Sequence, residues 1–147
     1  MTRTLRALAL GLLLLPSLSF ADEPGEAGIG DACSASQDCV AQALQDFYGK
    51  VLPLPVTDTV TMTDLSINGG IATINILLGH TREEAITKPA EEFALKKKLH
   101  DYATNLSCGE NQGLERLYLN TNGRILWNVY FADGEFFTND FITSCGE

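Results

Sequence analysis

The chain has 147 residues, of which 45% are hydrophobic and 20% charged, and it carries a formal net charge of −9 with a pI of about 4.6. This length suits one folded domain, which can bury a core without the help of a metal. Nucleic acid and anionic lipid surfaces repel a chain this acidic, so we expect neither as a partner.

The first 21 residues are typical of a secretory signal peptide. Arg3 and Arg6 precede an apolar run that is too short to span a membrane, and small residues at Ser19 and Ala21 mark a cleavage site. We therefore predict cleavage after Ala21 and a periplasmic or secreted location. The first cysteine is Cys33, far from that point, which argues against the lipid anchor of a bacterial lipoprotein.

Two further segments follow the signal peptide. Residues 22–32 are rich in Glu and Gly with almost nothing to bury, so we predict a flexible acidic leader. Residues 33–147 are predicted to form a single domain. Loss of Arg3 and Arg6 with the signal makes the exported part more acidic still.

All four cysteines lie in the exported part, and in an oxidising compartment an even count predicts two disulfides. A zinc site would need closely paired ligands, and no Cys-x-x-Cys motif is present, so we expect no metal and no cofactor. Of the three possible connectivities we favour Cys33–Cys39 together with Cys108–Cys145.

A first helix is predicted from Cys33 to near Gly49. Ser34 and Gln37 form a capping-box pattern, and Pro53 prevents continuation of the helix. Apolar residues recur at three- and four-residue spacing on one stripe: Val40, Ala43, Leu44, Phe47 and Val51.

A β-hairpin is predicted next. Residues 56–67 have the composition of a strand, and a shift in their apolar phase between Met62 and Leu65 indicates a bulge. Asn68-Gly69 is a hairpin turn signal. The return strand, residues 71–78, places four apolar side chains on one face: Ala72, Ile74, Ile76 and Leu78.

The pattern then becomes helical again. Thr81 and Glu84 form a second capping-box pattern, and Pro89 suits the first turn of a longer helix. Lys96, Lys97 and Lys98 are interpreted as a solvated helix face. The buried stripe of this helix is predicted to contain Leu95, Leu99, Tyr102, Ala103 and Leu106.

The last third, residues 108–145, is predicted to be a β-meander closed by a disulfide. Alternating Leu117 and Leu119 indicate a strand, and Asn122-Gly123 and Asp133-Gly134 indicate turns before a third strand containing Phe137 and Phe141. The middle strand should bury Ile125, Trp127, Val129 and Phe131 on one face.

These elements predict an α+β fold in the order α-β-β-α-β-β-β, stapled by the disulfides. Because hairpins rather than crossovers join the strands, we expect an antiparallel sheet of about five strands. Two main helices should pack on one face of that sheet.

Catalytic signatures are absent from the sequence: it has no nucleophile elbow, no phosphate-binding glycine loop and no His-Glu-x-x-His helix. His80 and His100 with Asp133, Glu135 or Asp140 could form the acid/base pair of a small hydrolase, and this is the least favoured hypothesis. We expect ordinary surface residues at these five positions and no enzyme.

Aromatic residues are concentrated in the last third and exceed what one face of a small sheet needs. Phe136 and Phe137 are adjacent in a strand and must point to opposite faces. Trp127, Tyr130, Phe136 and Phe137 are therefore the candidate docking surface, acting through side chains or by strand addition.

We predict a non-enzymatic binding or adaptor module whose partner is another envelope or secreted protein. The alternative is a carrier or chaperone for a small apolar ligand or an unfolded envelope protein, with the gap between helix and sheet as its pocket.

The closing segment resembles the C-terminal part of small, uncharacterised bacterial periplasmic proteins. The resemblance covers about a quarter of the chain and rests on Cys108, Asn122-Gly123, Tyr130, Asp133-Gly134 and Cys145. In those proteins a cysteine-bracketed meander also ends the domain, which implies export but no particular chemistry.

The order α-β-β-α-β after a signal is similar in topology to the C-terminal domain of TolA. Secretion-system pilotins are a further comparison, although they are lipoproteins and this chain lacks the lipid-accepting cysteine.

Overall fold

A computed structural model describes residue 33 and residues 36–110 and 113–146. The predicted signal peptide (1–21), the predicted leader (22–32) and Ser34 lie outside these residues. The elements follow one another as α2 (Gln37–Val51), β1 (Leu54–Thr57), β2 (Val60–Asn68), β3 (Ile71–Leu78), α3 (Arg82–Ala85), α4 (Pro89–Cys108), α5 (Gly113–Asn120), β4 (Arg124–Tyr130) and β5 (Phe136–Ile142).

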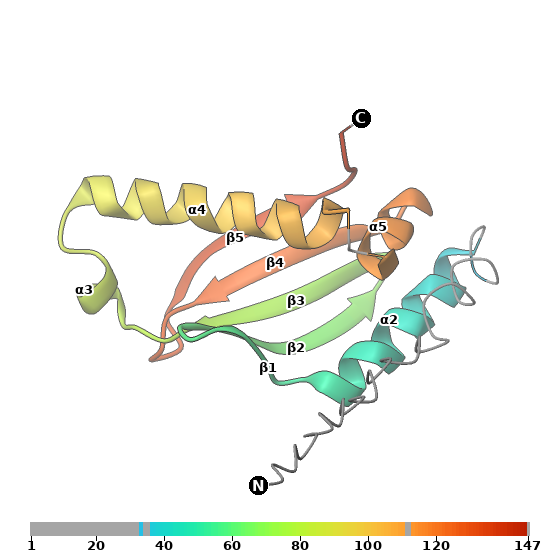
Figure 1. The fold of residues 1–147 in the computed structure, drawn as a ribbon, viewed down its shortest axis with the longest axis horizontal. Helices are drawn as coiled ribbons and strands as arrows, with labels where there is room; N and C mark the ends of the chain where they lie inside the picture. The colour runs from blue at the N-terminus through green and yellow to red at the C-terminus, as the bar shows by residue number, and fades with distance from the viewer. Residues whose placement is uncertain (1–32, 34–35, 111–112, 147) are drawn as a thin grey trace, which may run out of the picture.

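The strands form one five-stranded sheet in the order β1-β2-β3-β4-β5, which confirms an α+β fold (Figure 1). The prediction of a wholly antiparallel sheet is wrong at its centre, because β3 and β4 are parallel while the other neighbours are antiparallel. Parallel neighbours need a crossover, since the chain must return to the same end of the sheet. Helices α3, α4 and α5 form that crossover.

The segment around Leu117 and Leu119 is helix α5 and not the predicted first strand of a meander. Two alternating leucines are too short a pattern to separate strand from helix. The predicted hairpin turn at Asn122-Gly123 instead ends α5 as a Schellman motif, in which the Gly123 amide donates to the Tyr118 carbonyl and the Asn122 amide to that of Leu119. Asn122 has a φ of 64°, and a Cβ on Gly123 would lie 2.5 Å from the Tyr118 ring.

The predicted hairpin is confirmed as β2 and β3. Its turn lies one residue later than the predicted Asn68-Gly69, because Asn68 is still paired with Ile71 and the turn consists of Gly69 and Gly70, both with positive φ. The register shifts between Met62 and Asp64, inside the interval where the apolar phase predicted a bulge. The strand predicted over residues 56–67 is divided between β1 and β2, because the chain turns back after Thr57.

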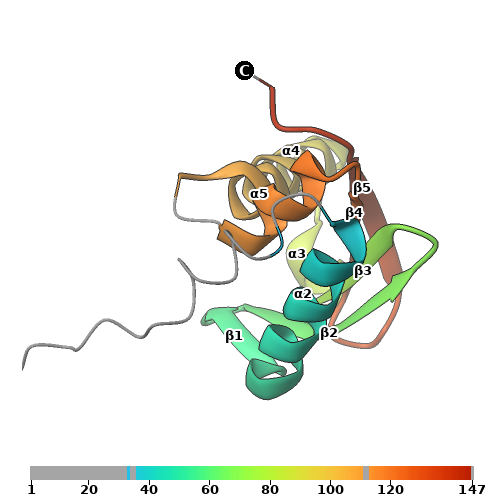
Figure 2. The same cartoon turned by 90° about the vertical axis from the view of Figure 1, so that its right-hand side faces the viewer.

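Helices α2, α4 and α5 lie on the same side of the sheet and enclose the core (Figure 2). The inward faces predicted for β3 and β4 are confirmed, since every one of these side chains is buried: Ala72, Ile74, Ile76, Leu78, Ile125, Trp127, Val129 and Phe131. The stripe of α2 needs one correction. Tyr48 is buried beside Val40 and Leu44, whereas Phe47 is 48% exposed. The helix also begins later than predicted, with Ser36 as its N-cap.

A buried polar pair joins the first helix to the crossover. The Tyr48 hydroxyl donates a hydrogen bond to the Glu115 carboxylate, so a side chain of α2 meets one of α5. Both residues are buried. Desolvation first, and the neighbouring Glu115 carboxylate second, raise the pKa of Tyr48 well above its usual value, so the hydroxyl keeps its proton.

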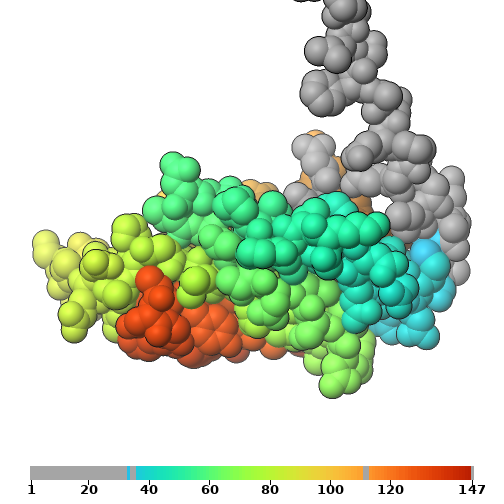
Figure 3. Space-filling model, turned by 90° about the horizontal axis from the view of Figure 1, so that it is seen from below, coloured from blue at the N-terminus to red at the C-terminus, as the bar shows by residue number. Residues whose placement is uncertain are grey.

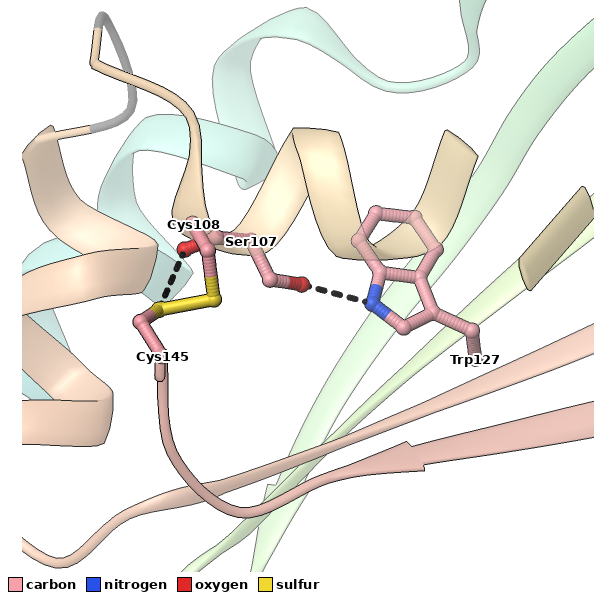
Figure 4. Close-up of a disulfide and its surroundings, with 4 residues drawn as sticks. All are labelled: Ser107, Cys108, Trp127 and Cys145. Atoms are coloured by element: carbon pink, nitrogen blue, oxygen red, sulfur yellow. Dashed lines mark hydrogen bonds between the residues drawn. A yellow bond between two sulfur atoms is a disulfide. The ribbon is translucent and has the colours of Figure 1, made fainter. Parts of the chain in front are cut away.

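The two disulfides are those that the sequence favoured, Cys33–Cys39 and Cys108–Cys145. The second joins the last residue of α4 to the segment after β5 (Figure 4). Next to it, the Trp127 indole N–H donates to the Ser107 hydroxyl over 2.9 Å, and both side chains are buried. The Cys145 sulfur lies 3.8 Å from the Ser107 carbonyl oxygen. The end of α4 is thus held to β4 by a hydrogen bond and to the chain end by a covalent bond.

We expect the double substitution Cys108→Ser/Cys145→Ser to lower the free energy of unfolding by about 2–5 kcal/mol, because the long loop between the two residues is no longer closed in the unfolded chain. Denaturant titration would measure this. Cys33→Ser/Cys39→Ser is the matched control and should cost less, since its sequence separation is 6 rather than 37. An unfolding midpoint that does not change under reducing conditions would contradict the prediction.

A second pair of substitutions compares two buried tyrosine hydroxyls. Tyr48→Phe should lower the free energy of unfolding by about 1.5–3 kcal/mol, because the buried Glu115 carboxylate loses a donor. The Tyr102 hydroxyl on α4 is also buried but has no hydrogen-bond partner among the described residues. Tyr102→Phe should therefore be neutral or stabilising. Equal losses of stability in the two variants would show that this assignment is wrong.

Candidate functional site

The sheet has an open face, which we define as the face turned away from α2, α4 and α5 (Figure 2). No helix of the described part of the chain covers it. Residues that lie directly opposite each other in a ladder share a face, so the strand register determines which side chains meet there. Three groups result, two of them apolar and one polar.

The first apolar cluster consists of Leu77, Tyr130 and Phe136. Leu77 is paired with Tyr130 across β3 and β4, and Tyr130 with Phe136 across β4 and β5. The Tyr130 and Phe136 rings meet edge to face with centroids 5.7 Å apart, and Phe136 remains 49% exposed. The turn after β4 is anchored to the end of β3, because the Ala132 amide donates to the His80 carbonyl. Figure 3 shows these segments side by side, with the β4–β5 turn in red and the β2–β3 hairpin in green.

The second apolar cluster consists of Leu126 and Phe141, which are paired across β4 and β5. Phe141 is 50% exposed, and the guanidinium of Arg124 lies 5.9 Å from its ring centroid. The sequence pattern did not identify Phe141 as a surface residue. Its partner Leu126 lies on the open face of β4. Only the register between β4 and β5 shows that Phe141 lies on that face as well.

A row of polar side chains separates the two clusters. We call it the amide row; it follows one cross-strand line through Asp64, Asn75, Asn128 and Asn139. The Asn75 amide donates to both carboxylate oxygens of Asp64 at 3.0 Å, and the Asn128 amide donates to the Asn75 oxygen at 3.1 Å. Side chains on one face recur every second residue, so each cluster lies about 7 Å from the amide row.

The predicted docking residues divide between the two sides of the sheet. Tyr130 and Phe136 are on the open face, whereas Trp127 and Phe137 are buried, with 1% and 6% of their surface exposed. Trp127 belongs to the alternating buried set of β4, and Phe137 packs against Phe131 in the core. These two residues are therefore core residues and not part of a surface.

A groove opens on the helix side of the sheet, between α4, α3 and the turn from β1 to β2. Its volume is about 320 Å³, and its apolar lining consists of Val60, Leu78, Ala85, Leu95, Leu99 and Tyr102. Lys98 and His80 also line it. Desolvation raises the pKa of Tyr102. The groove corresponds to the helix–sheet gap of the predicted carrier.

The histidines and carboxylates considered for catalysis do not meet in this groove. His100 Nδ1 and Asp140 Oδ1 are 2.8 Å apart, but the His100 side chain is exposed and neither residue lines the groove. Glu135 binds Arg82 over 2.6 Å, and Asp133 accepts a hydrogen bond from the Glu135 amide. Among the described residues every cysteine is in a disulfide, and no group of three or more His, Cys, Asp or Glu could hold a metal ion.

No protein-family model matches the chain, and no curated protein matches its sequence. Among solved structures, EpsS, the pilotin from the Vibrio vulnificus type 2 secretion system, is similar over 76% of this chain and 96% of its own, with a TM-score of 0.55 and 13% identity. A candidate secreted protein from Pseudomonas aeruginosa, PA3611, is similar over 70% of this chain and 88% of its own, with a TM-score of 0.52 and 8% identity. At these identities the likeness concerns the fold. No helix in the described ranges has the length and apolar character needed to cross a membrane.

Proposed function

We propose that this protein is a non-enzymatic adaptor of the bacterial envelope that binds another exported protein through the open face of its sheet. The observation that carries the proposal is an accessible sheet face on which two apolar clusters flank the amide row. The fold neighbours support the class, since one is a pilotin of a secretion system and the other a candidate secreted protein. Two disulfides fit an oxidising compartment.

The chemistry of the open face suits a protein partner. Protein interfaces combine a few large apolar anchors with polar groups that fix register, and aromatic residues are enriched among the anchors. Phe136 and Phe141 would be the anchors, while Asn128 and Asn139 offer amides for hydrogen bonds. Strand β5 adds a second means of attachment. It is the last strand of the sheet, so in the described structure only β4 is paired with its backbone.

Photo-crosslinking in the native envelope tests the proposal. A photoreactive amino acid placed at position 136 or 141 should capture one exported protein of defined mass. The matched control is position 93, because Phe93 is 73% exposed but lies on α4, on the other side of the sheet. Equal capture from position 93, or no product from 136 and 141, would contradict a docking role for the open face.

Once the captured protein is known, Phe136→Ser and Phe141→Ser should each weaken its binding by about tenfold or more, as expected for the loss of a large apolar anchor. Their stability should change by only about 1 kcal/mol, because both rings are half exposed already. Phe93→Ser should leave the affinity unchanged. An equal loss of affinity in all three variants, or no loss in any of them, would argue against Phe136 and Phe141 as anchors.

A further inference from the structure

The groove beside α4 is separate from the proposed docking surface, because it lies on the helix side of the sheet. It exists because the helices cover that side unevenly. Helix α2 packs on β2 and α5, whereas α4 packs on β5 and α5. Between them, Val60 and Leu78 at the open end of the β2–β3 hairpin line the groove together with Leu95 and Leu99 on α4.

The groove has the composition of a site for a molecule with an apolar part and a polar end. Its volume of about 320 Å³ lies at the lower end of the range for small-molecule pockets. Six of its twelve lining residues are the apolar side chains named above, and the other six are polar or charged: Thr57, Thr59, His80, Lys98, Asp101 and Asn105. An acyl chain that left water for this surface would be stabilised in proportion to the apolar area that it buries.

One positive charge at the groove has no counter-charge in the described structure. Lys98 is the sole lysine or arginine among the lining residues. Its two neighbours are both paired, Lys96 with Glu92 and Lys97 with Asp101, each over 2.8 Å. Asp101 also lines the groove, but its carboxylate is bound to Lys97. In the described part of this acidic chain, no ion pair to Lys98 is formed.

Tyr102 also lines the groove. Its hydroxyl oxygen is buried and has no hydrogen-bond partner among the described residues, so the ring and not the hydroxyl faces the groove.

From these observations we propose that the groove binds a single acyl chain that ends in a carboxylate, that is, a fatty acid. The chain lies against the apolar walls formed by α4 and the end of the β2–β3 hairpin, and the carboxylate meets Lys98. This is a ligand site in addition to the proposed adaptor role, and it does not depend on the open face. A neutral chain of the same length would occupy the same walls without the contact to Lys98.

The test is a titration of the purified exported chain with dodecanoate below its micelle concentration, followed by calorimetry and by amide chemical shifts. Binding should be one to one, with shifts in α4 and at the end of β3. Lys98→Gln should weaken dodecanoate binding by about tenfold, and its effect on dodecanol should be small. Lys96→Gln is the matched control, since this lysine lies on the same helix and pairs with Glu92, and neither of the two residues lines the groove. It should leave the affinity for dodecanoate unchanged.

A second variant probes the walls. Ala85→Leu narrows the groove and should weaken binding of dodecanoate and dodecanol alike. If this variant does not fold, the comparison of Lys98→Gln with Lys96→Gln still decides the question. The proposal is overturned if dodecanoate does not bind, if the two lysine variants bind it equally, or if the shifts lie on the open face. It is also overturned if a photoreactive residue at position 95 captures a protein while dodecanoate fails to bind. Capture from positions 136 and 141 is measured independently, so either proposal can fail alone.

Discussion

The parallel pairing of β3 with β4 is the constraint on which the rest of the structure depends. It places two strands that are distant in sequence at the centre of the sheet, and it forces the chain between them to cross over one face. Helices α4 and α5 of the crossover therefore lie on that face, together with α2. The opposite face has no helix from the described chain to cover it. The two candidate surfaces, the open face and the groove, both follow from this division.

The crossover is held in place by a few specific contacts rather than by apolar packing alone. Near its end, the hydrogen bond from Trp127 to Ser107 and the Cys108–Cys145 disulfide attach α4 to β4 and to the chain end. The Tyr48–Glu115 pair joins α5 to α2. Buried polar partners of this kind leave little freedom in geometry, because an unpaired donor or acceptor in the core is costly. They fix how α4 and α5 sit on the sheet, and hence the shape of the groove beside α4.

The two surfaces have different chemistry because they have different neighbours. On the open face, side chains of adjacent strands contact only one another and solvent. The half-exposed rings of the two apolar clusters lie there on either side of the amide row. In the groove, apolar side chains of α4 and of the β2–β3 hairpin face each other across a gap, and Lys98 stands at its margin. The open face is thus suited to a protein partner, and the groove to an apolar chain with a negative end. Residues proposed for catalysis contribute to neither surface as a group, since the exposed His100 side chain pairs with Asp140 outside the groove.

The sequence by itself determined the local structure that rests on periodicity and on turn chemistry. The β2–β3 hairpin with its bulge, the capping box at Thr81 and Glu84, and the buried faces of β3 and β4 all follow from patterns within about ten residues. The cysteine pairing that the sequence favoured is also the one in the structure. Such features could be predicted because the residues that cause them are close together in the chain.

Only the tertiary structure decided the sheet topology and both candidate surfaces. The leucines at 117 and 119 form a helix because Tyr118 and Glu115 are buried against partners that the local sequence does not specify. With that helix in place, Asn122-Gly123 ends a crossover instead of turning a hairpin, and β4 becomes parallel to β3. The same long-range register places Phe136 and Phe141 outside and Trp127 and Phe137 inside. Strand pairing between distant segments depends on how whole faces pack, and that information is spread over the chain rather than contained in any one stretch.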